Sequence, residues 1–166
     1  VLARRACVHD YHHACARVTF MSVEGNIAEE VGVYYVPPMQ LEAEWRNAAS
    51  LVRLAQKRLE DKMDMDDIYK DIETGNQQLW MIYKGKRLKA AMVTSIDTHP
   101  KCKVFHIMLI GGFDMQEWLM DALNVIKDAA KRLGCKTIEA DGRLGWAKHA
   151  PKCGFKEITR TYELEI

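Results

Sequence analysis

The sequence has no excess of charge of either sign and no long apolar run. Its 24 lysines and arginines nearly balance 23 aspartates and glutamates, so the formal net charge is +1. General nucleic-acid-binding and membrane-surface proteins usually carry a basic excess, and we therefore expect neither partner. No apolar stretch approaches the roughly 20 residues that a bilayer-spanning helix needs. The 166 residues, 48% of them hydrophobic, predict one globular domain in the cytoplasm.

The sequence also lacks paired cysteine spacings. Its five cysteines are an odd number, and they form neither a CxxC pair nor the spacing of a zinc ribbon. We expect free thiols in a reducing compartment, with disulfides as the alternative. A domain of this length buries enough surface to need no disulfide or metal, and we expect no metal site.

Residues 1–20 differ in composition from the rest of the chain, since they hold three histidines, three arginines and two cysteines. The segment from Met21, MSVEGNIAEE, reads like a natural start. We therefore expect residues 1–20 to be a disordered or extraneous extension and residues 21–166 to be the domain. Two alternatives stay open. The cysteines and histidines are zinc-ligand types, although closely packed, and the stretch is Arg-rich and acid-poor like a transit peptide.

Hydrophobic periodicity predicts an alternation of helices and strands. Asp64 is the expected N-cap of the second helix and Gly75 its stop, while Gly134 closes the long helix that begins at residue 119. The predicted helices are residues 41–59, 64–75, 119–133 and 144–152. The predicted strands are residues 32–36, 79–83, 88–96, 104–110 and 137–140, with 155–166 as a final strand or bent pair.

The end of the predicted helix over residues 119–133 carries a recognisable pattern. Gly134-Cys135 leads into the strand TIEA, and a short helix then precedes Gly154-Phe155. Together with the order of elements over residues 31–166, this pattern resembles the GNAT superfamily of acetyltransferases. The segment IEADGRLGWAKHAPKCGF also resembles small GNAT-like proteins encoded by bacteriophages. The resemblance implies an α/β (α+β) fold with a central mixed, mostly antiparallel sheet flanked by helices on both faces.

The resemblance implies a site for acetyl-CoA between the strands at 104–110 and 137–140, which splay apart in GNAT proteins. The acyl thioester and pantetheine would lie in the gap. The pyrophosphate would lie at the start of the long helix, where unpaired N–H groups and the helix dipole favour an anion. The residues expected to bind the co-substrate are Ile110, Gly111, Gly112, Phe113, Arg143 and Trp146.

The sequence departs from the family's phosphate loop, Gln/Arg-x-x-Gly-x-Gly/Ala. The pattern falls on residues 114–119, so that Asp114 takes the basic or amide position and Glu117 and Leu119 take the small positions. These side chains obstruct a close backbone approach to phosphate, and the two carboxylates oppose its charge. Gly111-Gly112 offers a cradle in a shifted register, or else simply ends a strand.

A second departure concerns the short helix. Many family members place a tyrosine four residues before the Gly-Phe pair, where it protonates the departing thiolate. That position is Ala150 here, and the asparagine often found seven residues earlier is Arg143. His149 and Cys153 lie close enough in sequence to substitute for the tyrosine.

Transfer to an amine also needs a group that accepts a proton. The candidates are His106, Glu139, Asp141, His149 and, at a strand end, Asp97. Each has a structural alternative. His106 can be a histidine whose hydrogen bonds are satisfied within the sheet, and Glu139 and Asp141 can belong to a solvated face of a strand. Asp141 can also form an ion pair with Arg143 that fixes the turn DGRLGW. A Cys–His nucleophile, from Cys102 or Cys153, has no local signature.

Two functions follow from these observations. The first is an acyl-CoA-dependent N-acetyltransferase that acts on the amine of a small molecule or a protein. The second is a catalytically silent GNAT-like phage protein with a protein partner, in a virion or host-interaction role. The fold alone does not choose between them, because function depends on the site.

Overall fold

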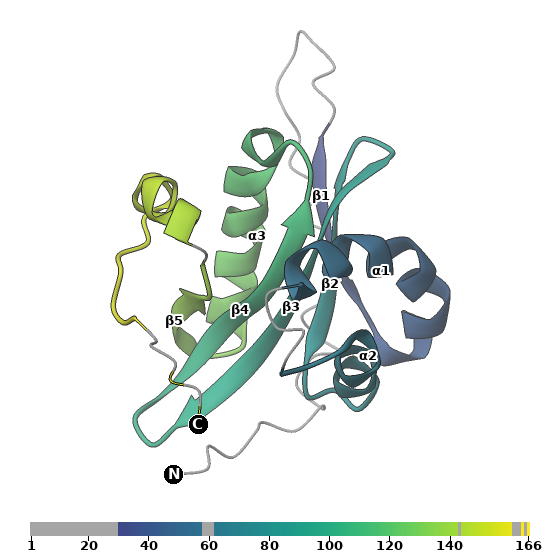
Figure 1. Ribbon diagram of the computed structural model, residues 1–166. Coiled ribbons are helices and arrows are strands. Elements are labelled where there is room, and N and C mark those ends of the chain that lie inside the picture. The colour runs from purple at the N-terminus through teal and green to yellow at the C-terminus, as the bar shows by residue number, and fades with distance from the viewer. Residues whose placement is uncertain (1–29, 58–61, 143, 161–163, 165) are drawn as a thin grey trace, which may run out of the picture.

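The computed structural model describes residues 30–57, 62–142, 144–160, 164 and 166 (Figure 1). The expectations for residues 1–20, including the zinc and transit-peptide alternatives, lie outside the described residues. The proposed start of the domain at Met21 also lies outside them and stays a prediction.

A five-stranded sheet forms the centre of the fold. Its strands lie side by side in sequence order. They are β1 (Val31–Val36), β2 (Gln78–Lys84), β3 (Arg87–His99), β4 (Cys102–Gly112) and β5 (Cys135–Ala140). Neighbouring strands are antiparallel from β1 to β4, whereas β5 runs parallel to β4. A parallel neighbour needs a crossover connection, and α3 (Leu119–Arg132) supplies it.

Helices cover both faces of the sheet. α1 (Leu41–Gln56) and α2 (Met65–Glu73) pack on one face and α3 on the other (Figure 1). β2 is buried on both faces because its side chains alternate: Leu79 and Met81 point to α1 and α2, and Trp80 and Ile82 point to α3. The predicted mixed, mostly antiparallel sheet with helices on both faces is confirmed.

The cap predicted for α2 is present. The Asp64 carboxylate accepts hydrogen bonds from the backbone N–H groups of Asp66 and Asp67, at 2.9 and 2.8 Å. The Asp67 carboxylate accepts one in return from the Asp64 N–H, at 3.0 Å. This reciprocal capping box satisfies donors that have no partner inside the helix. The helix ends before Gly75, whose positive φ of 76° suits glycine.

α3 carries a regular apolar stripe, and the stripe faces the sheet. Its buried residues are Leu119, Ala122, Leu123, Val125, Ile126, Ala129 and Ala130. They pack with Trp80, Met92 and Phe105 from three strands into one core. The long helix predicted from a period of 3.6 residues is therefore confirmed, together with its inward face.

We expect Ile126→Ala and Leu123→Ala each to lower the free energy of unfolding by about 2–5 kcal/mol, because each removes buried methyl groups and leaves a cavity. Ile126 is 1% exposed and Leu123 4%. Met120 on the same helix is 48% exposed, so Met120→Ala serves as the control and should change stability far less. Denaturant unfolding measures all three variants. Equal losses would show that the inward face is wrongly assigned.

The C-terminal predictions need correction. The short helix expected at 144–152 is two 3₁₀ helices, η4 (Leu144–Lys148) and η5 (Ala150–Cys153), with Pro151 in the second. The final strand is absent over 155–160. That segment has no apolar face to bury, since Ile158 is 62% exposed and residues 156–160 are all exposed. The rest of the predicted strand falls largely outside the described residues.

Three findings bear on the broad class of protein. Among the helices that the structure describes, none is both long and apolar enough to cross a bilayer. No group of three or more potential ligand residues could hold a metal ion in the described part of the chain. Cys102, Cys135 and Cys153 are free thiols.

Candidate active site

His106 lies in β4 between two carboxylates. Its Nδ1 is 3.2 Å from Oδ2 of Asp97, and its Nε2 is 3.3 Å from Oδ2 of Asp141. The histidine side chain is 23% exposed, whereas Asp97 is 38% and Asp141 68% exposed. We refer to these three residues as the His106 cluster. It joins a half-buried ring to two carboxylates that solvent and a ligand can reach.

The sheet register brings the cluster together from three strands. In β3, Ser95 lies opposite His106 and Asp97 is two residues further on, so both share the face of the histidine. In β5, Glu139 lies opposite His106, and Asp141, the residue that directly follows this strand, is two residues further on. The Ser95 hydroxyl donates to Oδ1 of Asp97 at 2.9 Å and holds that carboxylate in place.

These contacts give each ring nitrogen of His106 a hydrogen-bond acceptor. Either nitrogen can carry the proton of the neutral ring, because the Asp97 and Asp141 carboxylates both accept hydrogen bonds. In the tautomer whose Nδ1–H donates to Asp97, Nε2 is left as a proton acceptor near Asp141, the more exposed of the two carboxylates. The arrangement suits a group that accepts a proton from a ligand.

The other predicted proton acceptors are placed differently. Glu139 is half-buried beside His106 on the same face of the sheet. His149 is exposed just before η5, and in the described residues no hydrogen bond or ion pair joins it to the His106 cluster. Of the five candidates named from the sequence, the structure brings together His106, Asp97, Asp141 and Glu139.

The cluster marks the point where the pairing of β4 and β5 ends. Their pairing runs from Lys103 opposite Cys135 to Ile107 opposite Ala140, and its last bond is from the Asp141 N–H to the Ile107 carbonyl at 3.1 Å. β4 continues five residues further, to Gly112, without β5. Met108 is an extra residue in the β3–β4 register, a bulge at this same point. β5 ends at Ala140 with its pairing intact, so the splaying of the two strands that the resemblance implies stays a prediction.

Gly111 and Gly112 are explained by packing within the fold. A Cβ atom on Gly111 would lie 1.9 Å from the Leu51 carbonyl oxygen of α1, and one on Gly112 would lie 2.5 Å from the Lys89 carbonyl oxygen of β3. Both residues belong to β4 rather than to a loop. Close packing accounts for these glycines without a phosphate ligand.

The remaining residues expected to bind the co-substrate are scattered. Ile110 is half-buried against the core under α3, and Phe113, just after β4, is 59% exposed. Trp146 of η4 also packs partly against that core. Arg143 lies outside the described residues, so its role stays a prediction.

Four charged residues meet at the start of α3. The sequence pattern pointed to the two carboxylates there but not to the two lysines, which come from β2 and β3. Asp114 is in the left-handed region, with φ 52°, and its Oδ2 lies 2.8 Å from Nζ of Lys89. Oε2 of Glu117 lies 3.1 Å from the same ammonium and 3.3 Å from that of Lys84. The hydrogen bond from Lys89 is the main cause that holds the pKa of both carboxyls below their usual range, and the carboxylates raise the pKa of Lys89. We call these four residues the α3 charge cluster; its formal charges cancel.

This cluster fits a diphosphate poorly. The helix start has no side-chain cap, which leaves N–H groups for an anion. However, two carboxylates lie at that start, and both nearby lysines are already paired with them. A bound diphosphate would have to displace a carboxylate from each lysine.

Several solved structures of acetyltransferases resemble this fold. An aminoglycoside acetyltransferase from an uncultured soil metagenomic sample, in complex with sisomicin, matches with a TM-score of 0.63 at 10% identity, over 85% of this chain and 99% of that one. An aminoglycoside N-acetyltransferase in complex with CoA matches with a TM-score of 0.58 at 16% identity, over 88% and 99%. Glucosamine-6-phosphate N-acetyltransferase from Arabidopsis thaliana matches with 0.58 at 12% identity, over 81% and 97%.

This chain has the GNAT fold. The likeness to several acetyltransferases of that fold, each covered almost completely, agrees with the sheet order and with the parallel pairing of β5 to β4. No family model matches the chain, and no curated protein matches its sequence. At these low identities the comparisons establish the GNAT fold alone, and any reaction has to be argued from the residues of the site.

Sequence reasoning named Asp97 only as a strand-end candidate and missed its partnership with His106. The signal was available, because the turn at Pro100-Lys101 sets the hairpin register. Counting outward from His99 opposite Cys102 places Ser95 opposite His106, with Asp97 two residues away on the same face. Lys84 and Lys89 carried no comparable signal, since only the tertiary fold brings the β2–β3 hairpin to the start of α3.

Proposed function

We propose that this protein transfers an acyl group to an amine, with His106 as the proton acceptor. The observation that carries the proposal is the His106 cluster, which lies where the pairing of β4 and β5 ends on a sheet of the GNAT fold. The cluster supports the proposal because a proton acceptor must be held within hydrogen-bond reach of the proton that it removes, and His106 is exposed enough to meet a ligand there.

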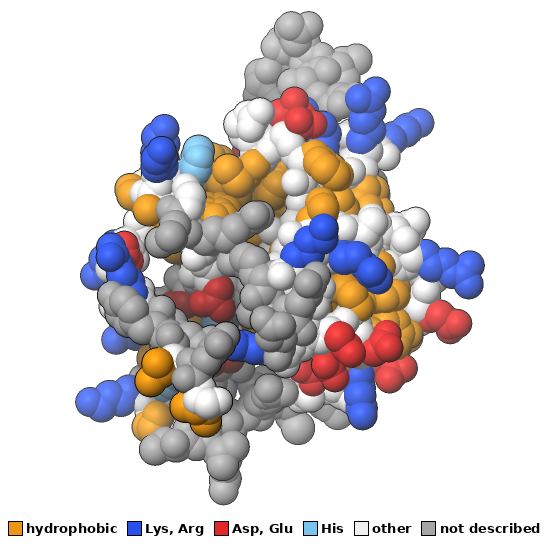
Figure 2. Space-filling view, viewed as in Figure 1, with side chains coloured by type: hydrophobic (Ala, Val, Ile, Leu, Met, Phe, Trp, Pro, Cys, Tyr) orange, Lys and Arg blue, Asp and Glu red, His pale blue; other side chains and the backbone are white. Residues whose placement is uncertain are grey.

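The acceptor in this proposal is a cationic amine. Asp97, Asp141 and Glu139 place three carboxylates around the histidine, and in Figure 2 acidic side chains lie within a recess in the region where Figure 1 draws β4 and β5. An ammonium group is attracted there, but it must lose a proton before its nitrogen can attack. The approaching ammonium donates to Asp141 and to Nε2 of His106, which lie close enough to share it.

The proton then moves from the amine to Nε2, while Asp97 keeps Nδ1–H in place and fixes the ring. The amine nitrogen bonds to the carbonyl carbon of the acyl thioester, and the carbon–sulfur bond breaks. The second proton of the amine leaves the nitrogen as the amide forms, and the departing thiolate takes it up to give the CoA thiol. Asp141 is the most exposed member of the cluster, so it also connects the ring to solvent, where the captured proton is released.

We propose acetyl-CoA as the acyl donor, on the strength of the GNAT fold and of a structural relative that is bound to CoA. The α3 charge cluster argues for weak binding, because Asp114 and Glu117 hold the two lysines that would meet a diphosphate. Residues 110–113, Trp146 and Arg143 remain the proposed contacts for the donor, with the two glycines offering backbone only.

The alternative is a protein that keeps the GNAT fold without the reaction, in a virion or host-interaction role with a protein partner. The observation that favours it is the pair of carboxylates at the start of α3, where the fold's donor needs an anion site. Ala150 in place of the family's tyrosine points the same way.

A direct assay separates the two functions. The protein is incubated with millimolar acetyl-CoA and, in turn, an aminoglycoside, glucosamine 6-phosphate and a lysine-containing peptide, and the free CoA thiol is followed over time. We expect thiol release that depends on the amine and rises with enzyme concentration. Cooperative unfolding of the same sample shows that the protein is folded. Thiol release no faster than background with every acceptor, from such a sample, would favour the silent alternative.

A further inference from the structure

A pocket of about 290 Å³ opens on the α3 side of the sheet, away from the His106 cluster. It lies between the second half of α3, β5 and the chain that leaves η5. Its lining residues are Leu123, Lys127, Ala130, Lys131, Cys135, Lys136, Thr137, Ile138, Cys153, Gly154 and Phe155. Neither the proposed reaction nor the proposed donor contacts uses any of them.

The floor of the pocket is apolar. Leu123, Ala130 and Cys153 are buried in the core, and Ile138 and Phe155 are half-buried against it. Burial raises the pKa of the Cys135 thiol, an effect that nearby Lys103 only partly opposes, so this thiol presents neutral sulfur to the pocket at neutral pH. A hydrocarbon body fits such a surface, because it removes apolar area from water without leaving a polar group unpaired.

The rim of the pocket carries one sign of charge. Lys127 and Lys131 lie one turn apart on α3, and Lys136 follows on β5, whereas no carboxylate lines the pocket. Lys131 has one exposed ion pair with Asp128, at 3.7 Å. Lys127 and Lys136 make no ion pair within the described residues. The rim therefore attracts an anion and gives it two ammonium groups without competing partners.

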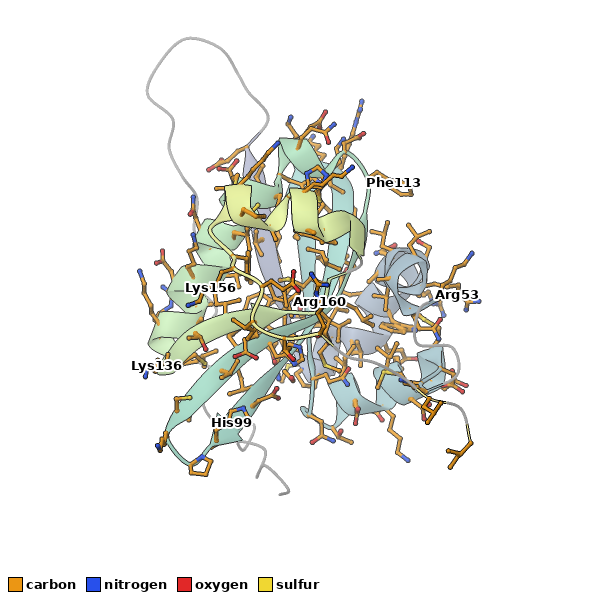
Figure 3. All side chains as sticks on the ribbon, turned by 60° about the vertical axis from the view of Figure 1, so that its left-hand side comes forward. Arg53, His99, Phe113, Lys136, Lys156 and Arg160 are labelled. Atoms are coloured by element: carbon orange, nitrogen blue, oxygen red, sulfur yellow. The ribbon has the colours of Figure 1, made fainter. Side chains whose placement is uncertain are left out.

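We propose that this pocket binds an amphipathic carboxylate, with its hydrocarbon body on the floor and its charged group among Lys127, Lys131 and Lys136. The ligand is distinct from the acyl donor and the acceptor. His106 projects from the opposite face of the sheet to Phe105 and Ile107, which point into the core under α3. Figure 3 shows Lys136 at the far end of the molecule from Phe113, after which α3 begins.

Octanoate is the probe, and isothermal titration calorimetry on the full chain is the measurement. We expect saturable binding of octanoate and none of acetate, which lacks the body, or octylamine, which has the opposite charge. The double variant Lys127→Gln/Lys136→Gln should weaken octanoate binding by about tenfold, since each lost charge pair near a surface is worth up to about 1 kcal/mol. The matched control Lys70→Gln/Lys86→Gln removes two exposed lysines elsewhere and should leave the affinity unchanged.

Thiol alkylation locates the ligand without any substitution. Octanoate should slow alkylation of Cys135, which lines the pocket, and leave Cys102 in β4 unaffected as an internal reference. Absence of binding at millimolar octanoate would overturn the proposal. So would equal binding of octanol, equal weakening by the control variant, or equal protection of both thiols.

Discussion

Replacing His106 with glutamine is expected to lower the rate of amine acylation by about 10²- to 10⁴-fold, the usual contribution of a positioned proton acceptor. Glutamine keeps a polar side chain next to Asp97 but has no nitrogen that takes up a proton. The loss should fall on kcat more than on KM, because the carboxylates that attract the amine remain. Initial rates of CoA thiol release measure both constants.

Two further variants make the test specific. His99→Gln changes an exposed histidine at the β3–β4 turn and should leave the rate unchanged. Asp97→Asn should also lower kcat, since the amide no longer favours the Nδ1–H tautomer. Added imidazole should partly restore the His106→Gln rate, which a merely structural histidine would not show. A full rate in His106→Gln would remove the histidine from the mechanism.

Replacing Asp114 with asparagine and Glu117 with glutamine is expected to tighten CoA binding by about tenfold or more at low salt. Each carboxylate would repel a diphosphate bound at the start of α3. Each also forms an ion pair with a lysine that could otherwise pair with the diphosphate. The lysines lower the pKa of both carboxyls, so the carboxylates are charged at neutral pH and become protonated only below the usual carboxyl range. Titration calorimetry of CoA at two salt concentrations gives the affinities.

The salt dependence separates charge from shape. The Debye length is about 10 Å at 0.1 M salt and about 30 Å at 0.01 M, so the gain from the double variant should shrink as salt rises. Glu42→Gln/Glu73→Gln removes two exposed carboxylates from α1 and α2 and serves as the control, with no expected change. We expect the natural protein to bind CoA weakly. Micromolar affinity in the unmodified protein would contradict this expectation, and no binding by any form would support the silent alternative.

Much of the fold could be predicted from the sequence, because each element's pattern is local. The apolar stripe of α3 repeats every three to four residues, and only one face of a helix with that repeat can be buried. Asp64 was identifiable as a cap because the orphan N–H groups at a helix start need an acceptor close in sequence. The chain beyond Phe155 was mispredicted because weak alternation does not make a strand when neither face has a core to cover.

The sequence by itself determined the residue types of the site: a histidine in a central strand and carboxylates near strand ends. Only the tertiary structure decided that Asp141 meets Nε2 of His106, on the other side of the ring from Asp97, because β5 reaches β4 through a helical crossover whose register no local pattern sets. The same holds for Gly111, which the sequence offered as a phosphate cradle and which α1 requires for close packing. The chemistry of a side chain depends on its residue type alone, whereas the distances between residues of different strands depend on how the whole core packs.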